Sequence, residues 1–258
     1  MAPIFKIALC QFSPKAAAVA ENFAIAESFL RSAAVKGCHL AVLPEFHLTS
    51  WEPEHPDFFA ATIESKPYLA NYQALARKLN INIVPGTICE AYLGESRRQR
   101  QRGSTQCGLL SGCRNGRDLR VLPEEKPLAS RTASFHPWSS SSPGLPRKLP
   151  RDGADLIIIP AFWSTAGGED VRGLNAGAEE TFLSSVLTAR AFENNAVVAF
   201  CNADGLSRVT LPIMGALGSI PPGEDKVEVV DVDLDVLRVA EERYKIRKDM
   251  QSLDYHYK

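Results

Sequence analysis

Almost uninterrupted apolar runs alternate with segments of helical periodicity in this chain, and that alternation restricts its fold more than any other feature. Residues 4–12, 39–44 and 81–87 predict strands, and the spacing of apolar residues over 21–36 and 68–79 predicts helices between them. A strand that is apolar along its whole length is typically covered on both faces. The first part of the chain therefore predicts a layered α/β arrangement.

The same order returns after Arg151. The predicted elements there are strands at 155–162, 197–202 and 227–232 and a helix at 179–194. The charged tail at 241–258 is expected to pack on the outside of the domain or against a partner subunit. Together the two parts predict a single α/β domain that spans residues 1–258.

The pattern fails in the middle of the chain. Residues 97–102 (RRQRQR) and 139–150 (SSSSPGLPRKLP) show no sustained period of two or of 3.6, and they are rich in Arg, Ser and Pro. An irregular segment of this length is unusual inside a compact domain. We therefore expect residues 97–150 to be aberrant or disordered, which leaves the α/β fold incomplete there.

The charge balance excludes several classes of partner. The chain has 29 basic and 30 acidic residues, a formal net charge of −1, so no overall field attracts nucleic acid or an anionic membrane. No stretch reaches membrane-spanning length and no signal peptide begins the chain, so we expect a cytoplasmic protein with a small-molecule substrate. The six cysteines lack paired CxxC spacing, which favours free thiols over a disulfide frame or a zinc site.

Several segments, in order, resemble the nitrilase superfamily of carbon–nitrogen hydrolases. They are IALCQF at 7–12, LAVLPEF at 40–46, ARKLNINIVPGTICE at 76–90, DGADLIIIPAFW at 152–163, TARAFENNAVVAFCNADG at 188–205 and YKIRKDM at 244–250. The resemblance implies an α-β-β-α sandwich, hydrolysis of a small amide or nitrile by a Glu-Lys-Cys triad, no cofactor, and a homo-oligomer built by packing sandwiches together.

The resemblance assigns the general base to Glu45, at the end of the LAVLPEF segment. A carboxylate at the carboxyl end of a strand lies where open α/β sheets bind ligands, and burial there would raise its pKa toward a useful range. The alternative for a lone glutamate is a strand-end acid that faces solvent. Trp51, Phe162 and Trp163 are candidates for lining the substrate pocket, although large aromatic side chains also belong in cores.

No cysteine of this chain matches the position of the family's nucleophilic cysteine. Family members carry the cysteine before an aromatic and an acidic residue, on a strand shortly upstream of the DGADLIIIP segment, and none of the six cysteines has that context. Cys201, in a predicted buried strand, is best interpreted as an apolar filler. Lys126 is the one loose candidate for the catalytic lysine; alternatively it is a solvated loop charge.

A shifted reading frame would restore part of the missing motifs. Read one nucleotide later, the codons for residues 122–133 (LPEEKPLASRTA) can encode YRKKNLWHPERP, which resembles the family's lysine segment. The same shift over 104–110 (STQCGLL) permits VLNVAYF, which resembles the strand before it. We infer a faulty gene model or a real frameshift. The shifted frame begins near Arg97 and ends near Arg151, and the segment that carries the nucleophile is absent from the chain.

Two classes of function stay open. In the first, the locus encodes a carbon–nitrogen hydrolase, and this chain is an inactive product of a faulty reading frame. In the second, the chain is a non-catalytic pseudoenzyme that acts as an interaction partner. Metal-dependent hydrolysis is a weaker alternative, because Glu45, His47 and His55 are too sparse and irregular for a ligand set. The sequence contains no GxGxxG, Walker loop or nucleophile elbow that would favour a nucleotide-binding protein or a serine hydrolase.

Overall fold

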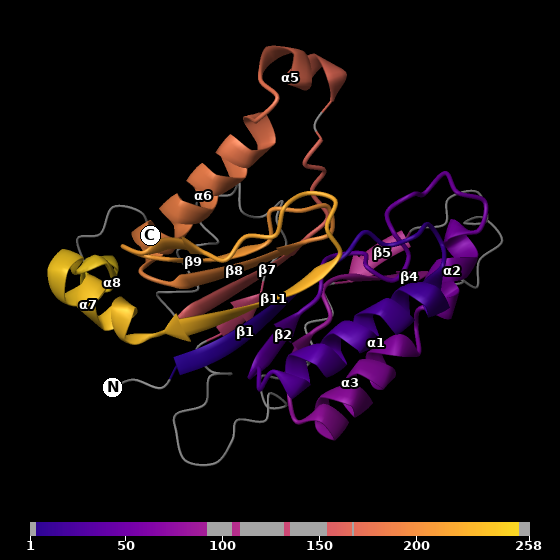
Figure 1. Ribbon diagram of the computed structural model, residues 1–258, viewed down its shortest axis with the longest axis horizontal. Coiled ribbons are helices and arrows are strands. Elements are labelled where there is room, and N and C mark those ends of the chain that lie inside the picture. The colour runs from indigo at the N-terminus through magenta and orange to yellow at the C-terminus, as the bar shows by residue number, and fades with distance from the viewer. Residues whose placement is uncertain (1–3, 92–104, 109–131, 135–153, 167, 253–258) are drawn as a thin grey trace.

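The computed structural model describes residues 4–91, 105–108, 132–134, 154–166 and 168–252 (Figure 1). The strands are β1 (Ile4–Gln11), β2 (Leu40–Val42), β3 (Asn82–Val84), β4 (Ile88–Ala91), β5 (Thr105–Gly108), β6 (Thr132–Ser134), β7 (Leu156–Ala161), β8 (Val197–Asn202), β9 (Arg208–Leu211), β10 (Gly215–Leu217) and β11 (Lys226–Asp233). The helices are α1 (Val19–Val35), α2 (Phe58–Glu64), α3 (Tyr68–Leu79), α5 (Glu169–Leu174), α6 (Ala178–Asn194), α7 (Asp235–Tyr244) and α8 (Ile246–Met250).

Two mixed sheets form the centre of the molecule. One has the order β11-β1-β2-β3, and the other has the order β10-β9-β8-β7-β6. In the first sheet β1, β2 and β3 are parallel neighbours, and in the second β6, β7 and β8 are parallel neighbours. The carboxyl ends of the parallel strands within each sheet therefore lie at one edge, which is where such sheets bind ligands.

Side-chain alternation along the strands explains the layers. In β1, Ile7 and Leu9 pack between the two sheets, whereas Ala8 and Cys10 face α1 and α3. In β7 and β8 one set of side chains joins the same central layer, and the other set, including Ile157 and Phe200, packs on α6. Figure 1 shows α1 and α3 over one sheet and α6 over the other. The α-β-β-α sandwich is confirmed, and it explains why the strands are apolar on both faces.

One predicted strand is shorter in the structure. The strand expected at 81–87 is formed only as β3, which ends at Val84; the chain then turns at Pro85–Gly86, and β4 begins at Ile88, beyond the predicted range, and pairs with β5 in a separate ribbon. Gly86 has φ +69°, and a Cβ at this position would collide with the backbone carbonyl of Pro44. Only glycine tolerates both the backbone conformation and the close approach. The periodicity of the run could not show this turn, because residues on both sides of it are apolar.

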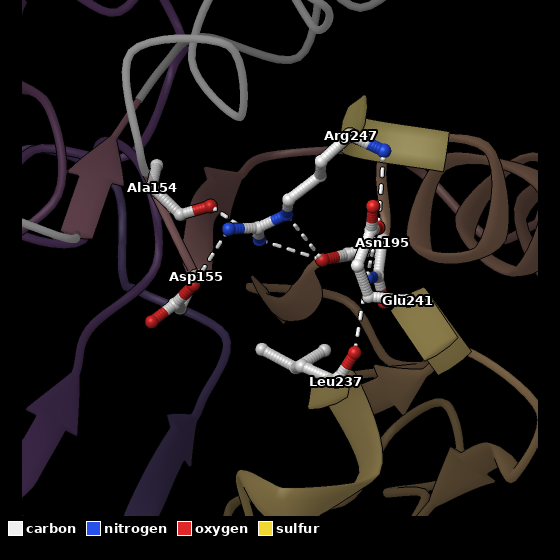
Figure 2. Close-up of polar contacts among 6 residues, drawn as sticks. All are labelled: Ala154, Asp155, Asn195, Leu237, Glu241 and Arg247. Atoms are coloured by element: carbon white, nitrogen blue, oxygen red, sulfur yellow. Dashed lines mark hydrogen bonds and ion pairs between the residues drawn. The ribbon is translucent and has the colours of Figure 1, made fainter. Parts of the chain in front are cut away.

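The YKIRKDM segment fastens the C-terminal helices to the sandwich. Figure 2 shows the Arg247 guanidinium of α8 between the start of β7 and the end of α6. It donates to the Asp155 carboxylate at 2.8 Å, to the Ala154 carbonyl at 2.9 Å and to the Asn195 carbonyl at 2.6 Å. The Glu241 carboxylate accepts from the Arg247 amide at 3.0 Å and from the Asn195 side chain at 3.0 Å. This cluster lies at the amino ends of β7 and β8, so it stabilises the fold away from the strand ends that bind ligands.

Much of the irregular middle segment lies outside the described residues. Within 97–150 the structure describes β5 and β6, and β6 pairs parallel to β7. The expected aberrance of this segment and the extent of the single domain stay predictions. Among the described helices, none combines the length and the apolar composition needed to cross a bilayer.

Candidate active site

Glu45 lies where three strand ends meet. It follows β2 directly, and its amide donates to the Ala161 carbonyl at the end of β7, across the sandwich, at 3.3 Å. On the other side the Phe46 amide donates to the Thr87 carbonyl, just beyond β3, at 3.0 Å. The carboxyl ends of β2 and β7 and the segment that follows β3 therefore converge around Glu45.

The environment of Glu45 alters its acidity. The residue is 2% exposed, and burial raises the pKa of its carboxyl group to about 7. Hydrogen bonds from the Phe162 backbone and the Thr87 side chain act in the opposite direction and limit the rise. A carboxyl group with a pKa near 7 can both accept and return a proton at neutral pH. The alternative of a solvent-facing strand-end acid is wrong, because the side chain is buried.

Two buried side chains support the backbone on the amino side of Glu45. The His47 Nδ1 atom lies 3.1 Å from the Pro44 carbonyl oxygen, which can only accept, so Nδ1 is the donor. Nε2 must then accept from the Tyr72 hydroxyl group, 2.6 Å away. Burial lowers the pKa of His47 to about 4, which keeps the ring neutral and fixes this tautomer.

The same contacts bear on the metal alternative. Both ring nitrogens of His47 are used within the protein, and the Nδ1 atom of His55 accepts from the Asp57 amide at 3.2 Å. Within the described part of the chain, no group of three or more His, Cys, Asp or Glu side chains is arranged to hold a metal ion. Glu45, His47 and His55 thus form no ligand set there.

A cavity of about 310 Å³ opens among the loops that follow β1, β7 and β8. Its lining residues are Ser13, Pro14, Phe162, Trp163, Ser164, Ala203 and Asp204. Phe162 and Trp163 were candidate pocket residues from the sequence. Trp51 is not among the lining residues; it is 40% exposed and stacks on Phe46 with a centroid separation of 4.8 Å.

Buried amide side chains hold the loops around this cavity. The Asn202 side chain accepts from the Trp163 amide at 2.7 Å and donates to the carbonyls of Trp163 and Gly205 at 2.9 and 2.8 Å. Gln11, at the end of β1, donates to the Pro221 and Glu224 carbonyls, both at 2.9 Å. Asn202 thus ties the loop after β7 to the end of β8, and Gln11 ties the neighbouring segment 221–224 to the end of β1, which favours a cavity that is formed before any ligand arrives.

The five lining residues that the sequence prediction missed are Ser13, Pro14, Ser164, Ala203 and Asp204. They are small or polar residues without periodicity, so no helix or strand pattern marks them. Their signal is positional, since each follows a predicted apolar strand within three residues. The rule that ligands bind beyond the carboxyl ends of strands could have found them.

None of the four cysteines whose side chains the structure describes has the environment of a nucleophile. Cys10, Cys38, Cys89 and Cys201 are buried. Burial raises the pKa of Cys201 to about 12, and its Sγ atom donates to the Val42 carbonyl at 3.1 Å. A thiol that is buried and protonated is not reactive, so Cys201 acts as the apolar filler that the sequence predicted.

The remaining candidates cannot be placed as side chains. Lys126 and Cys113 lie outside the described residues, and of Cys107 only its place in β5 is described. β6 is the strand immediately upstream of β7 and parallel to it, the position at which the resemblance expects the nucleophile. Its residues are Thr132, Ala133 and Ser134, so this strand carries no cysteine.

Comparison with known proteins matches a family model to the first part of the chain and solved structures to its fold. Residues 6–107 match the family model for carbon-nitrogen hydrolases. Among curated proteins, none matches the chain.

Solved structures of nitrilase-superfamily proteins match nearly the whole chain. NitFhit of C. elegans has a TM-score of 0.68 and 17% identity, and the match covers 96% of this chain but 65% of NitFhit. Nit3 of Saccharomyces cerevisiae, from branch 10 of the superfamily, has a TM-score of 0.68 and 19% identity over 96% of this chain and 97% of Nit3. An amidase of Nesterenkonia AN1 has a TM-score of 0.62 and 19% identity over 95% of this chain and 99% of the amidase. At these identities the likeness shows the fold alone.

Proposed function

We propose that this chain belongs to the nitrilase superfamily of carbon–nitrogen hydrolases, and that its locus encodes a hydrolase of small amides or nitriles in which Glu45 is the general base. The burial of Glu45 at the meeting point of three strand ends carries this proposal, since it gives a carboxyl group a pKa of about 7 beside a preformed cavity. Phe162 lies between Glu45 and the cavity, because its backbone forms a hydrogen bond with Glu45 and the residue also lines the cavity.

The proposed chemistry is covalent. Glu45 accepts the proton of a cysteine thiol while the sulfur attacks the amide carbon, and Glu45 then gives this proton to the leaving amine as the carbon–nitrogen bond breaks and a thioester forms. Glu45 then accepts a proton from water, which attacks the thioester, and the acid leaves as the thiol is restored. A lysine and backbone donors stabilise the negative oxygen in both steps. In support, one variant of the Nesterenkonia amidase carries the acetamide moiety of fluoroacetamide covalently at its active-site cysteine.

The described residues supply no nucleophile for this chemistry. The four cysteines with described side chains are buried, and β6 holds no cysteine where the nucleophile is expected. Without a covalent nucleophile the rate should fall by several orders of magnitude. We therefore propose that this chain is catalytically inactive and that restoring the shifted frame and the skipped segment restores activity.

The experiment measures ammonia release from small aliphatic amides and nitriles by three purified proteins. These are the chain as written, a version with the frame and segment restored, and the restored version with Glu45→Gln. We expect turnover from the restored protein only. A cooperative thermal melt of each protein is the control for folding, and a folded restored protein without turnover would contradict the proposal.

A non-catalytic partner is the second candidate, because the described sandwich is well packed although it shows no nucleophile. Sequencing the transcript separates the two, since an intact frame that encodes the chain as written favours the pseudoenzyme. A homo-oligomer is proposed in either case, with support from exposed apolar residues on α5 and α6: Leu174 is 92% exposed and Phe182 is 48% exposed. The cytoplasmic location stays a prediction from sequence.

A further inference from the structure

The cavity beside Glu45 has one charged lining residue among those described, Asp204. The remaining wall is apolar at Pro14, Phe162, Trp163 and Ala203 and carries hydroxyl groups at Ser13 and Ser164. A pocket with an apolar wall and one charged group selects ligands that match both. The acid therefore indicates what kind of molecule the cavity takes.

The Asp204 carboxylate is held in one orientation. Its Oδ2 atom accepts from the Thr165 amide at 2.8 Å and from the Thr165 hydroxyl group at 3.0 Å. Its Oδ1 atom accepts no hydrogen bond from the described residues, and no described cation forms an ion pair with this side chain. One oxygen thus fixes the carboxylate and the other remains able to accept from a ligand.

The groups around the cavity reinforce its negative charge. The Asp225 carboxylate accepts from the Ser13 amide at 2.9 Å, and the Glu179 carboxylate accepts from the Trp163 indole at 2.7 Å. The basic residue next to the lining in sequence, Lys15, is engaged in an ion pair with Glu21. Three carboxylates therefore lie in or beside the wall, and their field favours a cation.

We propose that the cavity binds the ammonium end of a small amino amide, with Asp204 as the recognition residue and Phe162 and Trp163 packing on the methylene groups. This inference rests on the proposed function, because it places the amide group of the same molecule toward Glu45. It narrows the substrate class from any small amide to aliphatic amides that carry a primary amine. An ammonium group that donates to Asp204 forms a charge-assisted hydrogen bond, which is stronger than a neutral one.

The test compares two probes of nearly equal shape, δ-aminovaleramide and hexanamide, in which a terminal ammonium replaces a methyl group. Binding of each to the full chain as written is measured by calorimetry at low and at physiological salt, so no turnover is required. We expect δ-aminovaleramide to bind at least about tenfold more tightly than hexanamide, with the preference reduced by salt.

Two variants show whether the preference for the ammonium probe comes from a direct contact with Asp204 or from the general negative field around the cavity. Asp204→Asn preserves the side-chain shape and an oxygen acceptor for Thr165 but removes the charge, so it should abolish the preference. Asp225→Asn removes a charge from a residue that does not line the cavity, so it should leave most of the preference. Each variant must retain a cooperative melt, and the comparison of the two probes on the unaltered chain stands without either variant.

Equal binding of the two probes, no binding of either, or a preference that survives Asp204→Asn would overturn the inference. The frame-restored protein separates this failure from failure of the proposed function. If it hydrolyses hexanamide as readily as δ-aminovaleramide, the function holds and the charge selection is wrong. If it binds δ-aminovaleramide selectively but hydrolyses neither amide, the selection holds and the proposed function is wrong.

Discussion

Replacing Arg247 should destabilise the fold more than replacing any exposed arginine. In Arg247→Met the aliphatic part of the side chain is kept, but the Asp155 carboxylate loses its ion pair, and the carbonyls of Ala154 and Asn195 lose donors. The Asp155 side chain is 4% exposed and that of Arg247 is 18% exposed, so water replaces the lost contacts poorly. Removing one partner of a buried ion pair costs about 3 to 5 kcal/mol.

The partial exposure of Arg247 places its effect at the lower end, about 3 kcal/mol, which corresponds to a fall in Tm of about 6 °C or more for a domain of this size. Urea and thermal unfolding followed by circular dichroism would measure it. Arg238→Met is the matched control, because the Arg238 ion pairs with Asp235 and Glu242 are exposed and should contribute little.

A double variant tests whether the ion pair between Arg247 and Asp155 accounts for the loss of stability. Arg247→Met combined with Asp155→Asn removes both charges, so its loss of stability should be smaller than the sum of the two single losses. An Arg247→Met protein as stable as the Arg238→Met protein, or additive losses in the double variant, would refute the role of the ion pair.

Three further predictions concern the surroundings of Glu45. The pKa of Glu45 in the folded protein, about 7, lies above its ordinary value of 4.5, so the free energy of unfolding should fall by about 3 kcal/mol as the pH rises from 4.5 to 7 and then level off. Glu45→Gln should remove this fall. Urea titrations across this pH range measure it, and a variant with the same pH profile as the unaltered chain would contradict the prediction. Tyr72→Phe leaves the His47 Nε2 atom buried without a donor and should cost about 1 to 3 kcal/mol in chemical unfolding, whereas a neutral effect would mean that the hydrogen bond is absent. Gly86→Ala should lower the Tm more than Gly37→Ala, because both positions have positive φ but only a Cβ at Gly86 would collide with the backbone of Pro44. Equal falls in Tm would show that the positive φ alone sets the cost.

Much of the fold could be predicted from the sequence, because burial of strands on both faces leaves a strong pattern. The apolar runs around Ile7 and Ile158 are visible in the sequence, and they form the central layer between the sheets. Which strands share a sheet could not be predicted from periodicity, since β11 joins β1 from the far end of the chain. The Pro85-Gly86 pair signals a turn in the sequence, but the close approach of Gly86 to Pro44 could not be predicted, because it is a contact with another strand end.

The site was predictable in part. Glu45 was found through the resemblance, and its strand-end position suggested burial, which the structure bears out. Asp204 was missed because its place in the cavity depends on the convergence of three loops, which no local pattern records. The pairing of His47 with Tyr72 was likewise invisible, since the two residues lie on different elements and meet only in the folded core.

The ionisation of Glu45 tests the central claim most directly, because the proposed general base depends on it. The measurement is a carbon-13 NMR titration of the side-chain carboxyl groups in the folded chain, with Glu45→Gln used to assign the resonance. We predict that the Glu45 carboxyl group titrates with a pKa of about 7. A value near the ordinary 4.5 would show that the carboxyl group is solvated and would contradict the account of this site.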